Sequence, residues 1–170
     1  MEAIGQVLNA MIEYYAGDVR RVNHFLKVYG FAKAIGEAEG LEQETQKILE
    51  VAALTHDIGI KNSEIKYQSA EGTYQQLEGP PEARKLLERL GFHEPLIARV
   101  CWLIAHHHIY DAITEIDYQI LVEADFLVNA FEAQLSGPAI QSVRDKLFRT
   151  GTGTQLLNTL YGGRIAAESK

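Results

Sequence analysis

The chain is poor in the residues that mark disulfide-rich and membrane-spanning proteins. Its 170 residues include one cysteine, Cys101, and four prolines. A single cysteine excludes an intramolecular disulfide and favours a reducing compartment, so we expect a cytoplasmic protein. The amino terminus has no basic stretch followed by an apolar run, which predicts no signal peptide. No segment approaches the roughly 18 uninterrupted apolar residues of a membrane helix, and we expect no membrane partner.

Positive charge is also scarce. Lysine and arginine number 16 against 23 aspartates and glutamates, which gives a net charge of −7. Proteins that coat a nucleic-acid duplex normally carry a basic stripe, so this balance argues against a duplex partner. A small phosphorylated substrate is compatible with it, because bound metal ions can reverse the sign of the local field.

Apolar residues recur at helical intervals along most of the chain, and strand patterns are nearly absent. The first predicted helix covers 4–12, and a second runs from an N-cap at Asp18 to about Glu39, with Gly40 as its stop. Further helices are predicted over 42–54, 80–90, 94–107, 118–134 and within a C-terminal extension, 138–170. With 46% hydrophobic and 23% charged residues, the composition is globular, and the whole chain, 1–170, is predicted to form one all-α domain.

Some segments do not follow this helical pattern. Residues 61–78 are polar and are predicted to form a long loop with at most one short helix. Pro80 and Pro81 are predicted to open the next helix, because proline is favoured in a first turn. Asp117 is the predicted N-cap of the long apolar helix, and the glycines of 150–154 are predicted to form a flexible connection.

Several ionisable residues lie within or at the end of apolar helical segments. Asp125 is embedded in the run Ile-Leu-Val-Glu-Ala-Asp-Phe-Leu, and His24 lies among apolar residues of the second helix. His56 and Asp57 follow the apolar run 51–54. A buried carboxylate costs several kcal/mol unless it is neutralised, paired or bound to a metal.

Neutral imidazoles and carboxylates are the ligands expected for iron, manganese, cobalt, nickel or zinc, with magnesium as a further option. Neighbouring residues on a helix point about 100° apart, so His56 and Asp57 can reach one ion only near a helix end, which Gly59 predicts. His24 and Asp125, from two other helices, would complete a site in the centre of the bundle.

Each of these residues also has an ordinary structural explanation. A single histidine on an apolar face is more often a hydrogen-bonded core residue. Asp125 could pair with Arg20 or Arg99, and the run His106–His108 could end a helix in solvent, where imidazolium suits the helix dipole. The metal interpretation is favoured because four such groups recur on separate helices of one small chain.

This ordered set resembles the HD-domain metal-dependent phosphohydrolases. Their pattern is a histidine on an early helix, a His-Asp pair at the end of a later helix, and a distant aspartate. The matching residues are His24, then His56 and Asp57 in ALTHDIGIK, then Asp125 in ILVEADFL. The resemblance covers roughly residues 18–132 and implies a helical bundle of the HD-domain type in which these four residues hold a metal.

The resemblance also concerns a second ion. Many relatives with two metals add a histidine in the pattern HPxxGA and another in a following His-His pair. His106 and His107 match the pair. The first pattern is not matched, because the corresponding stretch reads EGPPEA and has Glu78 in the position of the histidine. We therefore expect one strongly bound ion, with Glu78, His106 and His107 as the residues that could hold a second.

Two basic residues are candidates for binding phosphate. Lys61 matches the lysine that usually follows the His-Asp turn in the family, and an ammonium beside the metal would clamp a phosphoryl oxygen. Arg20 lies one helical turn before His24 and could reach the same group. The ordinary alternatives are a solvated loop lysine and a surface salt bridge.

The leading functional hypothesis is metal-assisted hydrolysis of a phosphate ester or anhydride, in a small molecule resembling a nucleotide. The predicted catalytic residues are Asp57, which would bridge ions or orient water, Lys61, and one of His106 and His107 as a ligand or proton donor. Two alternatives stay open. Some relatives use two irons to activate dioxygen, and the fold could also serve as a non-catalytic, metal- or nucleotide-binding regulatory module. An amphipathic first or last helix could form a homodimer surface.

Overall fold

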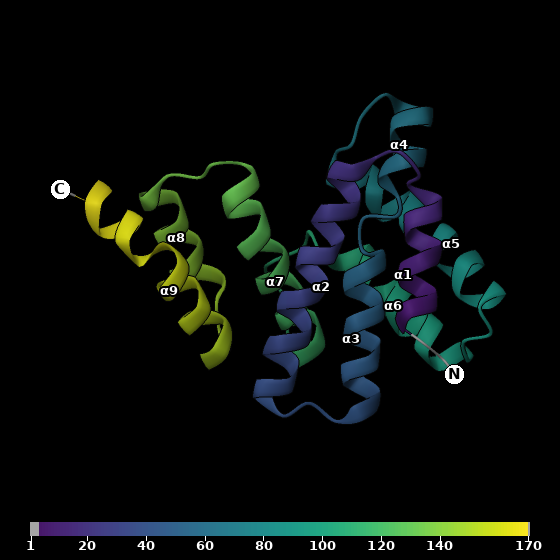
Figure 1. Cartoon of the computed structure of the whole chain (residues 1–170), viewed down its shortest axis with the longest axis horizontal. Coiled ribbons are helices and arrows are strands. Elements are labelled where there is room, and N and C mark those ends of the chain that lie inside the picture. Colours follow the sequence, from purple (N-terminus) through teal and green to yellow (C-terminus); the bar gives the residue numbers. More distant parts are fainter. Residues whose placement is uncertain (1–3, 170) are drawn as a thin grey trace.

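The computed structural model describes residues 4–169, and this part of the chain is helical, without a strand (Figure 1). The helices are α1 (Ile4–Tyr14), α2 (Val19–Glu39), α3 (Gln43–Thr55), α4 (Ile60–Tyr67), α5 (Gly72–Arg89), α6 (Glu94–His106), α7 (Ile116–Glu132), α8 (Gly137–Leu147) and α9 (Gly151–Glu168). The predicted all-α class is confirmed. None of these helices has the length and hydropathy needed to cross a bilayer.

The centre of the molecule is built from α2, α3, α6 and α7. Helices α2 and α3 lie side by side, α7 packs against both, and α6 packs against α3 and α5 (Figure 1). Apolar side chains that are fully buried fill the space between them, among them Val28, Ile35, Leu49, Leu54, Leu103 and Leu121. The last two helices, α8 and α9, pack on each other at one end and reach the bundle through α2 and α7. The polar residues predicted as ligands therefore come from helices that share one core.

The boundaries of α2 follow from local chemistry that the sequence displays. The side chain of Asp18 accepts a hydrogen bond from the backbone N–H of Arg21, as an N-cap does. Gly40 adopts φ 74°, the left-handed conformation that glycine adopts without steric cost, and its N–H bonds back into the last turn. Both predicted ends of this helix are confirmed.

Most of the polar stretch 61–78 is helical, with only residues 68–71 outside a helix, which corrects the predicted loop. It contains α4 and the first part of α5, so that Pro80 and Pro81 lie inside a helix that starts at Gly72. Two features hid this helix. Its buried face carries Gln75 and Glu78, which weakens the apolar periodicity. Gly79 precedes Pro80 and has no Cβ to clash with that ring, which removes one of the steric costs of a proline inside a helix.

Two further expectations about helix starts are wrong. Helix α7 begins at Ile116, and Asp117 lies in its first turn, where it pairs through both carboxylate oxygens with Arg99 at 2.7 and 2.9 Å. The glycines of 150–154 begin α9, because Thr150 acts as an N-cap that accepts the N–H of Gly153 at 2.9 Å. The Thr150 side chain sets the start of α9, whereas the side chain of Glu115, the N-cap residue of α7, makes no capping hydrogen bond.

Candidate metal centre

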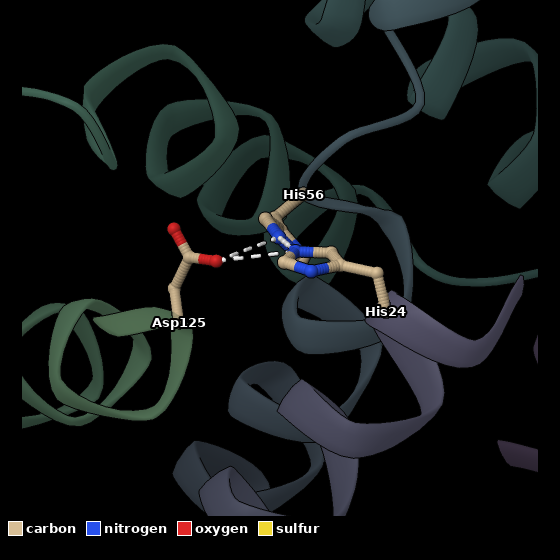
Figure 2. Close-up of side chains that lie close together, drawn as sticks. All are labelled: His24, His56 and Asp125. Carbon is tan, nitrogen blue, oxygen red and sulfur yellow. Dashed lines mark hydrogen bonds and ion pairs between the residues drawn. The ribbon is translucent and has the colours of Figure 1, made fainter. Parts of the chain in front are cut away.

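Three helices bring one ligand each to a common point in the core. His24 projects from α2, His56 from the end of α3 and Asp125 from α7, and the three side chains point toward one another (Figure 2). The Nε2 atoms of the two histidines are 3.3 Å apart. The Oδ1 atom of Asp125 lies 3.2 Å from Nε2 of His24 and 3.5 Å from Nε2 of His56. All three residues are buried.

Asp57 adds a second carboxylate to this group. Its Oδ2 lies 3.2 Å from Nε2 of His24 and 3.4 Å from Nε2 of His56. This is possible because α3 ends at Thr55, so the chain turns between His56 and Asp57. The hydroxyl of Tyr15 donates to the backbone carbonyl of Asp57 at 2.8 Å and holds that turn. The structure thus brings together the four predicted metal ligands.

The other oxygen of Asp57 faces a further histidine. Nε2 of His107 lies 3.5 Å from Oδ1 of Asp57, and His107 is 1% exposed. Within residues 4–169, this buried Nε2 has no hydrogen-bond partner. The carboxylate of Asp57 therefore lies between two groups of potential ligands. One group is His24, His56 and Asp125, and the other is His56 and His107.

The hydrogen bonds of the three imidazoles determine where their lone pairs lie. In each ring Nδ1 is placed to donate its proton: to the carbonyl of Ala53 from His56, to the carbonyl of Ile104 from His107, and to Glu132 from His24. A neutral imidazole that donates from Nδ1 has its lone pair on Nε2. All three lone pairs then face carboxylate oxygens, an arrangement that repels unless positive charge lies between them. This is the usual orientation of histidines that bind a metal.

The attraction between the imidazoles and the carboxylates also shifts the pKa values of His24 and Asp125. Burial lowers the pKa of His24, but hydrogen bonds with Asp125 and Asp57 outweigh it and raise that pKa to about 10. Burial raises the pKa of Asp125, but His24 and His56 outweigh it and hold that pKa well below its usual value. The cluster therefore attracts positive charge, whether as protons or as a metal cation.

The spacing of the donor atoms suits a cation as well. Ligand atoms that each lie about 2.1 Å from a shared ion are separated by roughly 3.0 to 3.4 Å in right-angle or tetrahedral arrangements. The nitrogen–oxygen separations among His24, His56, Asp57 and Asp125 are 3.2 to 3.5 Å, so three of the four fall in this range and the fourth exceeds it by 0.1 Å. The residues present fit a divalent metal with mixed imidazole and carboxylate ligands.

A polar cavity of about 520 Å³ opens onto this centre. It is lined by His24, Asp57 and Asp125 together with Arg20, Arg21 and other residues. Arg21 is held by ion pairs with Asp18 and Glu64. Arg20 makes no ion pair with any residue in 4–169 and is exposed, so its guanidinium can bind an anion in the cavity.

The structure does not bring Lys61 and Glu78 to the metal centre. The ammonium of Lys61 donates to the backbone carbonyl of Tyr14 at 3.0 Å and lies over the Tyr14 ring, outside the cavity lining. Glu78 accepts hydrogen bonds from Lys66 at 2.8 Å and from Tyr67 at 3.1 Å. Each charge is satisfied by a neighbouring surface group, and the roles predicted for them have no support in this geometry.

His106 is likewise turned away from the centre. Its Nδ1 donates to the carbonyl of Trp102 at 2.7 Å, and its ring stacks on the Trp102 indole with centroids 3.9 Å apart. Successive helical residues point about 100° apart, so only His107 of the predicted pair faces Asp57. His107 is therefore a buried potential ligand, whereas His106 is a packing residue.

Sequence reasoning missed two residues that shape the site. Glu132 accepts from His24 at 2.9 Å and pairs with Lys27 at 2.7 Å, and it lies seven residues after Asp125, on the same face of α7. That spacing is the signal that would have found it. His108 lines the cavity and donates from Nε2 to Gln75 at 3.1 Å, and burial lowers its pKa to about 4. His108 is therefore a neutral wall of the cavity at pH 7.

A family model described as HD domain matches residues 21–144. The chain belongs to the HD domain family. The four candidate metal ligands, His24, His56, Asp57 and Asp125, lie inside the matched region. The HD fold is also found in the crystal structure of a predicted HD superfamily hydrolase from an uncultured Thermotogales bacterium, which is 23% identical, with a TM-score of 0.65 over 96% of this chain and 91% of that chain. No curated protein matches the sequence.

Proposed function

We propose that this HD-domain protein is a metal-dependent phosphohydrolase that cleaves a phosphate ester or anhydride in a small, nucleotide-like molecule. One observation carries the proposal: three buried imidazoles direct their Nε2 lone pairs at the carboxylates of Asp57 and Asp125, beside a cavity that an unpaired arginine lines. A caged cation next to an anion-binding group is the arrangement that phosphoryl chemistry requires.

Different residues of the chain would bind the first and the second metal ion. His24, His56, Asp57 and Asp125 would hold the first ion, and Asp57 and His107 would contribute to a second. The imidazole-rich set favours manganese, iron, cobalt, nickel or zinc over magnesium, which prefers oxygen ligands. When bound, such an ion supplies polarisation of a phosphoryl oxygen and makes a coordinated water more acidic.

Other residues would bind and orient the reactants. Arg20 would form charge-assisted hydrogen bonds to phosphate oxygens in the polar cavity. Asp57, with 19% of its side chain exposed, is accessible enough to accept a hydrogen bond from the attacking water. Asn129 donates to Oδ1 of Asp125 at 3.0 Å and keeps that carboxylate oriented.

The test is a hydrolysis screen over nucleotides and dinucleotides, with each of the six divalent ions, run in parallel without and with dioxygen. We expect hydrolysis with at least one transition ion, seen as inorganic phosphate from a nucleotide or as the cleaved nucleotide from a dinucleotide, and a loss of about 100-fold or more in kcat/KM for Asp57→Ala. Asp145→Ala is the matched control, because Asp145 is 60% exposed and pairs only with Arg144.

Three outcomes would contradict the proposal. The first is full activity of Asp57→Ala, which would place the chemistry elsewhere. The second is turnover that strictly requires dioxygen, which would make the site an oxygenase centre. The third is a protein that binds metal tightly and hydrolyses nothing in the screen, which would favour a binding module.

A further inference from the structure

A second, largely apolar cavity lies between α7 and α8. Its volume is about 400 Å³, within the range of roughly 300 to 1,000 Å³ typical of small-molecule sites. Val122 and Phe126 of α7 form one wall, and Val143 and Leu147 of α8 form the other. The Phe126 ring is fixed by an edge-to-face contact with Phe148, with centroids 5.8 Å apart, so this wall is preformed.

The apolar cavity adjoins the metal centre. Asp125 and Asn129 line both this cavity and the polar cavity. These two residues are one helical turn apart on α7 and are hydrogen-bonded to each other. A molecule that extends past this turn would have one end beside Arg20 and the metal ligands and the other end between α7 and α8.

The rim of the apolar cavity carries groups that suit a planar heterocycle. Tyr110, in the loop before α7, is 53% exposed, so its ring is available for stacking. Lys146 is exposed and makes no side-chain ion pair or hydrogen bond within residues 4–169. The amide of Asn129 uses its N–H₂ on Asp125, which leaves its oxygen as an acceptor. A donor and an acceptor around an apolar slot recognise a ring with polar edges, not a plain alkyl chain.

We infer that this cavity receives the heterocyclic ring of the substrate, and that α8 and the loop before α7 determine which phosphate compounds are bound. The inference rests on the proposed function for the position of the phosphate. Helix α8 follows the four candidate metal ligands in the sequence, and the inference gives it a role in substrate selection.

The test compares two substrates that share the same primary phosphate ester and differ in the ring. These are a nucleoside 5′-monophosphate and ribose 5-phosphate. Both kcat/KM and equilibrium binding to the metal-free protein are measured for each. We expect the nucleoside 5′-monophosphate to be preferred by about tenfold or more, because burying a ring removes a large apolar area from water.

Two variants locate the preference. Val143→Phe places a ring in the cavity and should bring the ratio between the two substrates close to one. Ser142→Phe is the matched control, because Ser142 is the exposed neighbour on α8 and does not line the cavity, so the preference should persist. Lys146→Ala changes only an exposed rim residue and should reduce the binding preference several-fold even if Val143→Phe folds poorly.

The results separate this inference from the proposed function. The inference is overturned if the wild-type protein binds the nucleoside 5′-monophosphate and ribose 5-phosphate equally well. It is also overturned if neither Val143→Phe nor Lys146→Ala changes the preference between them. Both conclusions hold even if both substrates are hydrolysed. A binding preference that Val143→Phe abolishes supports the pocket even if no phosphate is released, in which case only the proposed hydrolysis fails.

Discussion

His106 and His107 are neighbours in sequence but have different surroundings in the structure. His107 is buried against Asp57, whereas His106 stacks on Trp102. We expect His107→Ala to lower metal occupancy and kcat/KM by about 10-fold or more, because a ligand to the cluster is lost. His106→Ala should keep metal content close to wild type. Metal analysis of both purified variants is the measurement, and equal losses in the two would contradict the assignment.

Glu132 provides a second residue-scale prediction. It accepts the Nδ1 proton of His24 and so directs Nε2 of that ring at the other ligands. Glu132→Ala should weaken metal binding by about 10- to 100-fold, the usual effect of losing such a partner. Competition against a chelator of known affinity measures this, with Glu37→Ala as control, since Glu37 is 57% exposed and pairs with Lys33. Unchanged metal affinity in Glu132→Ala would show that His24 needs no orienting carboxylate.

The convergence of the four candidate ligands could be predicted because each lies within or at the end of an apolar pattern. Asp125 stands among buried residues of α7, and such a carboxylate needs a compensating partner. Lys61 and Glu78 lack such a signal, because both lie in a polar stretch where many partners are available. Their contacts with Tyr14 and Lys66 depend on tertiary packing that local sequence does not encode.

At the scale of elements, α5 is the part of the fold that the sequence concealed. Helix prediction depends on apolar periodicity and on proline as a boundary, and α5 has polar residues on its buried face and two prolines inside. By contrast, α2 was predictable at both ends, because its caps are local. A local cap alone does not make a helix end predictable: Thr150 caps α9 as locally as Asp18 caps α2, but the glycines that follow Thr150 have low helix propensity and hid that start.

The crossing of the α3–α4 turn with α5 depends on Gly59. A Cβ at this position would lie 2.6 Å from the backbone nitrogen of Gly79 and 2.7 Å from the carbonyl oxygen of Gln75. Gly59→Ala should therefore lower the free energy of unfolding by about 1 to 3 kcal/mol. Gly163→Ala is the control, because a Cβ there meets nothing within 4 Å, and it should stabilise α9 by up to about 1 kcal/mol. Chemical denaturation measures both, and a Gly59→Ala protein as stable as wild type would refute the close contact.

The C-terminal helices are tied to the bundle by a bond that depends on pH. Glu39 of α2 accepts the N–H of Thr152, in the first turn of α9, at 2.8 Å. A hydrogen bond with the Thr152 side chain, together with this one from its backbone, lowers the pKa of Glu39 below its usual value of 4.5. The stabilisation is then present above pH 4.5 and is lost as the pH falls through the lowered pKa.

Glu39→Gln provides the measurement of this effect. Wild type should be more stable than the variant at pH 7 by less than about 1 kcal/mol, because the side chain is exposed, and the difference should shrink at pH 3.5. Urea denaturation of both proteins at the two pH values gives the difference directly. A difference that is constant with pH, or that grows as pH falls, would contradict this account.

At the scale of the whole molecule, the sequence predicted the class of fold and the family, because helical periodicity and four spaced ligands persist along the chain. The family match extends to residue 144 and thus takes in most of α8. The cavity between α7 and α8 could not be predicted, since it depends on how both helices are placed in the fold. Organisation as one domain and the formation of a homodimer stay predictions.

The central claim is that His24, His56, Asp57 and Asp125 hold a cation. Its most direct test is anomalous X-ray diffraction from crystals grown with Mn²⁺, recorded at the manganese absorption edge. The account predicts a strong anomalous peak between these four side chains, absent from the Asp125→Ala protein. Crystals that diffract well and show no peak there, or that carry manganese only elsewhere, would contradict it.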